Sequence, residues 1–275
     1  MSELDSPARL ASTVYPEPPG RDDPAELYHE ASKLSPATAA HVLAGARRLA
    51  GSPALRAAVA RASLRHPELP LVSLPAPAPL EGSLETVIRR RRSARAFAGE
   101  PIAGSALAAL LQACYGVTGA LGEGEPDRAQ PLRSTPSGGA LYPLDVYVAA
   151  SRVDGLAPAL YRYDPLASGL ERTGSPAGVA AATANPELAA GAAATVVLTA
   201  TFWRSRFKYG LRAYRFALLE AGHAAQNVLL AATALRLAAV PLGGFFDRRL
   251  DAALELDGVD RSSLYVVCVG APGNA

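Results

Sequence analysis

The chain has 275 residues, 49% of them hydrophobic, and its 27 basic and 25 acidic side chains leave a net charge of +2. This length supports one large domain, or a domain with an appendage, around a sizeable core. The balanced charge gives no reason to expect binding to nucleic acid or to a membrane surface. The first residues lack the basic and apolar runs of a secretory signal, so we expect a cytoplasmic protein.

Cysteine and histidine usage argues against metal or disulfide chemistry. Cys114 and Cys268 stand in apolar surroundings and form no CxxC motif, so we expect packed thiols. The four histidines are scattered without metal-ligand spacing, and no bound metal is expected.

The N-terminal third divides into three parts by composition. Residues 1–22 are rich in proline, serine and charge, and are expected to be poorly ordered. A helical pattern follows to about residue 65, with Pro36 and Pro53 suited to first helical turns. Five prolines between residues 67 and 82 predict a stiff linker. We therefore expect an N-terminal helical extension (1–66), a Pro-rich linker (67–82) and a main domain (83–275).

Within the main domain, Ser83 is a good N-cap for a helix to about Arg90. A second helix is predicted over Gly104–Tyr115, and the glycine-rich acidic segment Gly116–Gln130 is typical of a mobile flap. The predicted strands are Asp145–Ala150, Ala159–Tyr163, Leu170–Thr173, Ala194–Thr201 and Leu264–Val269, the second and third forming a hairpin. No βαβ rhythm is present, so an α+β fold is expected.

A long alanine-rich helix contains the uncharged span Ala221–Leu235. A helix that is apolar on nearly all sides is buried, and fifteen residues are too few to cross a bilayer, which needs about 20. This span predicts a central core helix that also reaches a subunit interface.

Three motifs could hold a ligand. The basic run Arg89–Phe97 (RRRRSARAF) joins guanidinium groups to a hydroxyl, as a phosphate monoester requires, although a solvated surface is the alternative. Adjacent glycines in Pro136–Pro143 (PSGGALYP) let backbone approach a flat ligand, and a tight turn is the alternative. Pro241–Phe245 (PLGGF) exposes backbone N–H groups, or is a helix cap followed by a turn.

In this order, the three motifs resemble the nitroreductase superfamily of FMN enzymes over about residues 83–270. The resemblance implies a central, mostly antiparallel sheet flanked by helices, with the long helix at a homodimer interface. It implies FMN as the cofactor and the backbone N–H of Gly244 as a donor to flavin N5. The residues that would contact FMN are Arg91, Arg92, Ser93 and Arg95 at the phosphate end, Pro136, Ser137, Gly138 and Gly139 along the isoalloxazine, and Leu242, Gly243 and Gly244.

Longer phrases look like the SagB/McbC-type azoline dehydrogenases within that superfamily. They are PSGGALYPLDVYV (136–148), ALYRYDP (159–165), FKYGLRAYRFALLEAGHAAQNVLLAA (207–232), PLGGF (241–245) and the early YHEASK (28–33). This resemblance implies oxidation of thiazoline or oxazoline rings to azoles, with Lys208 as the catalytic base beside Tyr209. It also implies a peptide or carrier-bound substrate, and a cyclodehydratase or an assembly line as partner.

Two points depart from the pattern or stay open. The family's late basic residue at the phosphate is missing from GAPGNA (270–275), so the arginine run, Arg212 or Arg215 would replace it. Lysine is normally protonated at neutral pH, so a base role for Lys208 requires burial or neighbouring cations such as Arg204 and Arg206. The alternative functions are an NAD(P)H-dependent nitro- or quinone reductase and a non-catalytic scaffold subunit of a biosynthetic complex.

Overall fold

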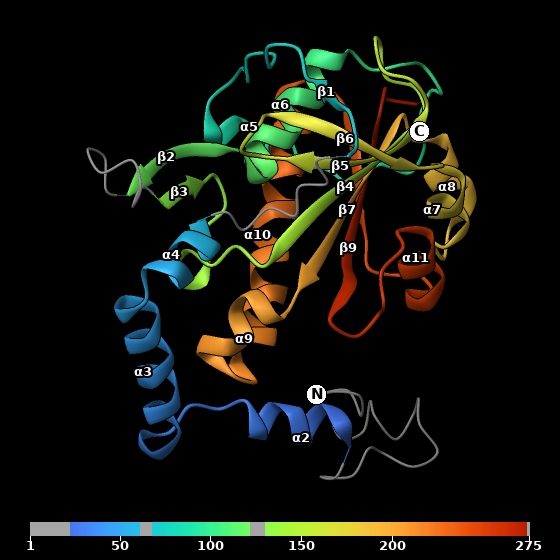
Figure 1. The fold of residues 1–275 in the computed structure, drawn as a ribbon. Coiled ribbons are helices and arrows are strands. Elements are labelled where there is room, and N and C mark those ends of the chain that lie inside the picture. Colours follow the sequence, from blue (N-terminus) through green and yellow to red (C-terminus); the bar gives the residue numbers. More distant parts are fainter. Residues whose placement is uncertain (1–22, 61–67, 122–129, 274–275) are drawn as a thin grey trace.

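The computed structural model describes residues 23–60, 68–121 and 130–273. A seven-stranded sheet lies between two layers of helices, and its order is β1-β6-β5-β4-β7-β9-β8 (Figure 1). Every neighbouring pair is antiparallel, which confirms the predicted α+β fold with a central antiparallel sheet. The strands are β1 (Leu71–Ser73), β4 (Leu144–Ala150), β5 (Ala159–Asp164), β6 (Gly169–Gly174), β7 (Ala194–Thr201), β8 (Ala238–Leu242) and β9 (Arg261–Gly270).

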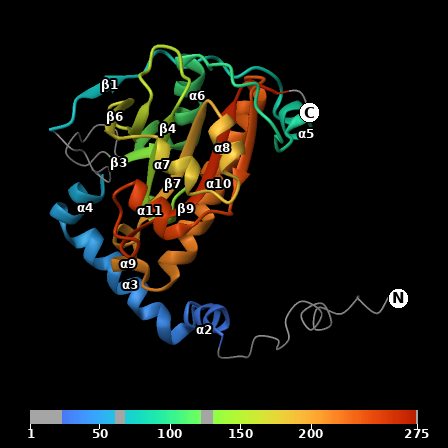
Figure 2. The same ribbon diagram turned by 90° about the vertical axis from the view of Figure 1, so that its right-hand side faces the viewer.

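Helices cover both faces of the sheet. One face packs against α6 (Gly104–Tyr115) and α10 (Arg212–Ala234). The other packs against α7 (Ala177–Ala181), α8 (Pro186–Gly191) and α11 (Asp247–Ala253), which lie in front of the sheet in Figure 2. Strand β7 is buried along almost its whole length, so its sequence, ATVVLTAT, contains no charged residue and does not alternate apolar with exposed polar positions.

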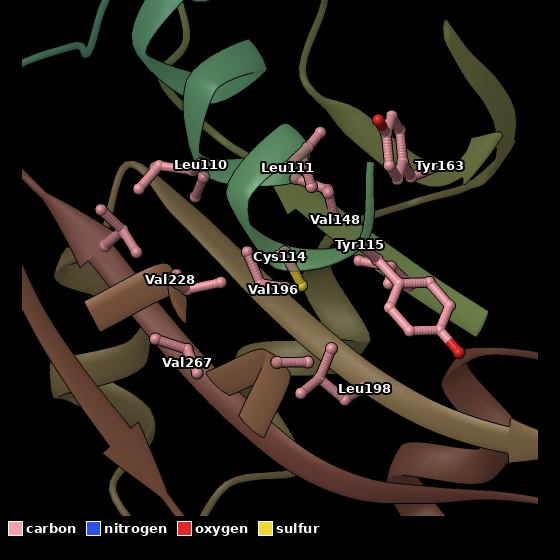
Figure 3. Packing of buried hydrophobic residues seen from close by; sticks show 14 of the residues in the cluster. Leu110, Leu111, Cys114, Tyr115, Val148, Tyr163, Val196, Leu198, Val228 and Val267 are labelled. Carbon is pink, nitrogen blue, oxygen red and sulfur yellow. The ribbon is translucent and has the colours of Figure 1, made fainter. Parts of the chain in front are cut away.

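The core on the α6 and α10 side is closely packed. Figure 3 shows Leu110 and Cys114 of α6 facing Val196 of β7, with Val228 of α10 beside them. Cys114 and Cys268 are both buried and free, as predicted. Burial raises the pKa of Cys114 to about 12 and that of Cys268 to about 11, so neither thiol is a ready nucleophile.

Several helices begin where the sequence predicts. Pro36 and Pro53 are the first residues of α3 (Pro36–Gly51) and α4 (Pro53–Ala60), which follow α2 (Pro24–Ala31). Helix α5 (Leu84–Arg90) begins after Ser83, whose hydroxyl accepts a hydrogen bond from the backbone N–H of Thr86 at 3.2 Å. This capping bond satisfies an N–H that would otherwise have no partner within the helix.

The structure corrects three element predictions. Residues 71–73 of the expected linker form β1, which pairs with β6 at the edge of the sheet. The expected flap begins as β2 (Val117–Leu121), which pairs with β3 (Gln130–Arg133). Part of PLGGF belongs to β8, and Pro241 is tolerated because β8 is an edge strand. The predictions for residues 1–22 and for the middle of the flap fall outside the described residues.

Helix α10 is buried on one face only. Ala217, Ala221 and Val228 pack into the core, whereas Leu219 is 60% exposed and His223 and Gln226 are exposed. The prediction of burial on nearly all sides is therefore wrong within one chain. Among the described residues, no helix combines the length and the apolar character needed to cross a membrane.

Candidate functional site

The arginine motif lies along the outer edge of strand β8. After α5 ends at Arg90, the chain becomes extended, and Ser93 forms a parallel bridge with Ala239. The backbone N–H of Ala94 donates to the carbonyl of Ala239 at 2.9 Å. These contacts fix the motif against the start of β8, close to the end of α10.

A cavity of about 400 Å³, called here the arginine cavity, opens at this place. Four cationic side chains line it, which suits an anion such as a phosphate monoester. Its lining residues are Arg90, Arg92, Ser93, Ala94, Arg95, Ala96, Thr233, Arg236, Leu237, Ala238, Pro272 and Gly273.

The lining residues include three of the four residues of the arginine motif that were predicted to contact the phosphate. Arg92, Ser93 and Arg95 face the cavity as expected, whereas Arg91 is not among the lining residues. The Arg92 Nη1 donates to the carbonyl oxygens of Arg89 at 2.7 Å and Arg91 at 2.8 Å, which fixes its orientation.

Arg236 is a lining residue that sequence reasoning missed. It follows the end of α10 with a φ of 59°, and its backbone N–H donates to the carbonyl of Thr233. A positive φ is uncommon for a residue other than glycine, so the turn after α10 holds the Arg236 backbone in this conformation. The available signal was that Arg236 is the only lysine or arginine between residues 216 and 247.

Arg212 and Arg215, the alternatives proposed from sequence, lie at the opposite end of α10. Both contact the end of α2: Arg212 donates to the Ser32 carbonyl at 3.3 Å and Arg215 to the Ser32 hydroxyl at 2.7 Å. Helix α10 has 23 residues, so about 34 Å separates its ends. Within one chain, neither side chain therefore reaches the arginine cavity.

The PLGGF motif continues from the same strand. Strand β8 ends at Leu242, and Gly243 and Gly244 follow with exposed backbone. The Gly244 carbonyl accepts a hydrogen bond from the backbone N–H of Ala184 at 2.9 Å, which fixes the turn. A ligand along β8 could contact both the arginine cavity and this glycine pair.

A second cluster forms where the PSGG turn meets helix α9 (Trp203–Tyr209). Gly139, in the short 3-10 helix Gly138–Ala140, has a φ of 66°. A Cβ atom at Gly139 would fall 2.5 Å from both the Lys208 Nζ and the Tyr209 hydroxyl oxygen. The two side chains thus converge over a position that only glycine can occupy without displacing them.

Aromatic contacts hold this cluster together. Tyr209 and Phe216 pack edge to face with ring centroids 5.0 Å apart, and a Cβ at Gly138 would lie 3.1 Å from Phe216. The Lys208 Nζ lies 4.9 Å from the centroid of the Tyr209 ring. We call Gly138, Gly139, Lys208, Tyr209 and Phe216 the glycine corner.

The two arginines proposed to influence Lys208 are engaged elsewhere. Arg204 donates to the Asp145 carboxylate at 3.0 Å, and Arg206 lies over the Trp203 ring at 4.6 Å. Lys208 is half-buried, so its surroundings are set mainly by the turn and by Tyr209.

A buried carboxyl group lies behind the same turn. Glu220 of α10 is 2% exposed, and its Oε1 accepts a hydrogen bond from the Tyr115 hydroxyl. Burial raises the pKa of Glu220 to about 7, against the opposing effects of the Ser137 and Tyr115 hydroxyls and the Arg133 and Arg204 charges. Sequence reasoning missed this residue, because nothing in the local pattern distinguishes it from an exposed glutamate.

The predicted site residues therefore form two clusters within one chain. The arginine cavity and PLGGF lie along β8 near the C-terminal end of α10, whereas the glycine corner lies at its N-terminal end. Figures 1 and 2 show α5 and α9 near opposite ends of α10. The structure brings Lys208, Tyr209 and Gly139 together but does not bring them to the arginines.

Comparison with known proteins gives the family. The model of the nitroreductase family matches residues 88–271. A protein of Methanocaldococcus jannaschii with a provisional nitroreductase name is 34% identical over 181 residues, which cover 64% of this chain and 86% of that protein. The microcin B17-processing protein McbC of Escherichia coli is 29% identical over 146 residues, 48% of this chain and 52% of McbC.

Solved structures agree on the fold. A provisionally named nitroreductase of Anabaena variabilis superposes with a TM-score of 0.63 at 28% identity, covering 75% of this chain and 42% of that one. The E. coli microcin synthetase McbBCD complex, solved with truncated pro-MccB17 bound, contains a chain with a TM-score of 0.56 at 22% identity, covering 73% of this chain and 77% of that one. The sequence match with McbC thus spans about half of that protein, and the superposition covers less than half of the Anabaena protein. The matched span, residues 88–271, contains the glycine corner and the four arginines of the arginine cavity, and the chain belongs to the nitroreductase family.

Proposed function

We propose that this chain is an FMN-dependent oxidoreductase that oxidises azoline rings, thiazoline or oxazoline, to azoles. The observation that carries the proposal is the convergence of Lys208 and Tyr209 over Gly139. The similarity to McbC, a microcin B17-processing protein, supports a peptide or carrier-bound substrate. A cyclodehydratase or an assembly line would be the source of such a substrate.

The donor set of the arginine cavity fits a flavin phosphate. Arg92, Ser93 and Arg95 would hold the phosphate, with Arg236 in place of a basic residue near the C-terminal end. Leu242, Gly243 and Gly244 would lie against the ring system, with the Gly244 N–H donating to flavin N5. When bound, FMN supplies the acceptor for the hydride equivalent that the substrate loses.

The glycine corner would handle the proton. Oxidation of an azoline removes a proton from one ring carbon and a hydride equivalent from its neighbour. Lys208 would accept the proton at Nζ, and the Tyr209 hydroxyl would orient the lysine or the ring nitrogen by a hydrogen bond. Pro136–Gly139 would line the flat ring system, with the Lys208 and Tyr209 side chains occupying the space over Gly139.

The separation of the two clusters supports a homodimer in which each site takes residues from both copies. Within one chain Lys208 lies at the end of α10 opposite the arginine cavity. The exposed face of α10, with Leu219, His223 and Gln226, carries no formal charge and suits an interface between copies. A second chain could then bring its glycine corner to the first chain's flavin.

The second candidate is an NAD(P)H-dependent nitro- or quinone reductase, and the provisional name of the M. jannaschii relative favours it. Such an enzyme receives its hydride directly and needs no base at Lys208. The third is a non-catalytic scaffold, which bound flavin with turnover would exclude.

The decisive variant is Lys208→Ala. The sequence contains two lysines, so Lys33→Ala, at an exposed ion pair with Glu30, is a matched control. Azole formation is followed as a mass loss of about 2 Da, the two hydrogens removed from an azoline peptide. We expect turnover to fall by roughly 10²–10⁴ in Lys208→Ala only, with flavin content unchanged.

Equal azole formation in wild type and Lys208→Ala would refute the base assignment. NADPH-driven nitroaromatic reduction that is unaffected by Lys208→Ala, without azole formation, would favour the reductase. A colourless purified protein, which contains no flavin, would favour the non-catalytic scaffold.

A further inference from the structure

Helix α3 touches the backbone of the proposed base. Gly45 of α3 is buried, and a Cβ atom there would fall 2.7 Å from the Lys208 Cα and 2.9 Å from the Lys208 carbonyl oxygen. Contacts this short are not found around real Cβ atoms. The two helices therefore approach closely because residue 45 has no side chain.

The end of α2 binds the segment immediately after Lys208 and Tyr209. Arg215 donates from Nε to the Ser32 hydroxyl at 2.7 Å and from Nη2 to the His29 carbonyl. The Tyr28 hydroxyl donates to the Leu211 carbonyl at 3.3 Å. The YHEAS motif thus ties the start of α10 to the extension.

Helix α9 is anchored at its first turn, where Arg204 donates to the Asp145 carboxylate at 3.0 Å and the Trp203 Nε1 to the Asp260 carboxylate at 2.8 Å, whereas its last turn carries Lys208 and Tyr209. It has seven residues and no side-chain N-cap, and it is followed by Gly210 with a φ of 56°. Isolated helices this short are unstable, so α9 depends on what packs against it. In this helix, the side chain of Lys208 lies over Gly139, and the backbone of Lys208 contacts Gly45.

We propose that Tyr28–Ser32 and Gly45, called here the N-terminal clamp, position Lys208 and Tyr209 over the glycine turn. The inference rests on the proposed function only in assigning chemistry to Lys208. The clamp residues are positioning residues, since they act through α9 and touch no reacting atom. Figures 1 and 2 both show α3 beside α9 and far from α5, so the arginine cavity does not depend on them.

The test compares two glycines of one helix. Gly45→Ala places a methyl group against Lys208, whereas a Cβ at Gly51, also in α3, meets nothing within 4 Å. Both substitutions replace a glycine of α3 by the better helix former alanine, and only the one at residue 45 meets Lys208. Acetylation of Lys208 and Lys33 by N-hydroxysuccinimide acetate, quantified by peptide mass spectrometry, reports the lysine position without turnover.

We expect the Lys208-to-Lys33 acetylation ratio to rise roughly tenfold in Gly45→Ala, because overpacking displaces α9. Gly51→Ala should match wild type, and flavin content should be unchanged in both. An unchanged ratio in Gly45→Ala with normal folding would overturn the clamp.

A second variant, Arg215→Ala, tests the clamp independently in case Gly45→Ala does not fold. Arg215→Ala removes the bonds to Ser32 and His29, and Arg249→Ala, on the exposed surface of α11, is its control. The acetylation ratio should rise in Arg215→Ala only. If Lys208→Ala abolishes azole formation while neither clamp variant changes the ratio, the clamp is wrong and the function stands. If wild type forms no azole but the ratios shift, the clamp stands without that function.

Discussion

The two ends of α10 are built from different kinds of contact. At the C-terminal end, the arginine cavity is formed by segments that adjoin strand β8, and backbone hydrogen bonds such as Ala94 to Ala239 fix it. At the N-terminal end, Lys208 takes its place from Gly139 and Gly45, which come from distant parts of the chain. The first end should bind its ligand independently, whereas the second should be sensitive to remote substitutions.

The largest effect is expected at the arginine cavity. Arg92→Ala combined with Arg95→Ala removes two charge-assisted contacts of about 1.5–3 kcal/mol each, so FMN affinity should fall by roughly 10²–10⁴. Arg91→Ala, whose side chain does not line the cavity, should cost much less. Fluorescence titration of the apoprotein with FMN measures both. Full affinity in the double variant would break the phosphate assignment, and an equal loss in Arg91→Ala would show that the sequence motif locates the phosphate better than the cavity does.

The next effect concerns the carboxyl group behind the glycine corner. The pKa of Glu220 is about 7 in the folded protein and about 4.5 ordinarily, so the folded state retains a proton that the unfolded state releases between these values. The free energy of unfolding should therefore decrease as the pH rises from about 4.5 to 7, by about 3 kcal/mol, and stay level above 7.

Glu220→Gln should remove that dependence, and denaturant unfolding at several pH values measures it. Glu85→Gln, at an exposed pair with Arg89, should keep the wild-type profile. If the dependence of unfolding free energy on pH is unchanged in Glu220→Gln, Glu220 is not protonated at neutral pH. Its carboxylate would then carry a negative charge beside the turn that contains Ser137 and Gly139.

The smallest effect is expected from Tyr209→Phe, which keeps the ring packed on Phe216 and removes one hydroxyl. Loss of one hydrogen bond of about 0.5–1.5 kcal/mol should reduce azole formation by up to about tenfold. Tyr214→Phe, in the next helix, should leave the rate unchanged. A loss in Tyr209→Phe as large as that in Lys208→Ala would make the tyrosine, rather than the lysine, the main proton-transfer group.

Much of the fold could be predicted because its signals are local. The bounds of α6 and β7 follow directly from apolar periodicity and length, and Ser83 marks the start of α5. Strand β8 could not be predicted, since Pro241 and two glycines are typical of a turn and only pairing with β9 makes the segment a strand. Strand β1 was hidden for the same reason, among the prolines of residues 67–82.

The candidate site shows the same limit. Motifs predicted roles for Arg92, Arg95, Gly139 and Lys208, because each belongs to a recognisable local pattern. Gly45 and Glu220 acquire their proposed roles from tertiary contacts, and their neighbours in sequence carry no sign of them. Arg236 was marked in the sequence only by its isolation from other basic residues. The separation of the two clusters also depends on the length and direction of α10, which become clear only when its ends are located in space.

The most direct test of the account is subunit complementation between its two ends. Lys208→Ala and the Arg92→Ala/Arg95→Ala double variant, each inactive alone, are co-expressed with different tags and assayed for azole formation. If each site joins the arginine cavity of one copy to the glycine corner of the other, mixed dimers contain one intact site. Random assembly then restores about a quarter of wild-type activity, since half of the dimers are mixed and half of their sites are intact. Activity no higher than that of the separate variants would contradict the shared site.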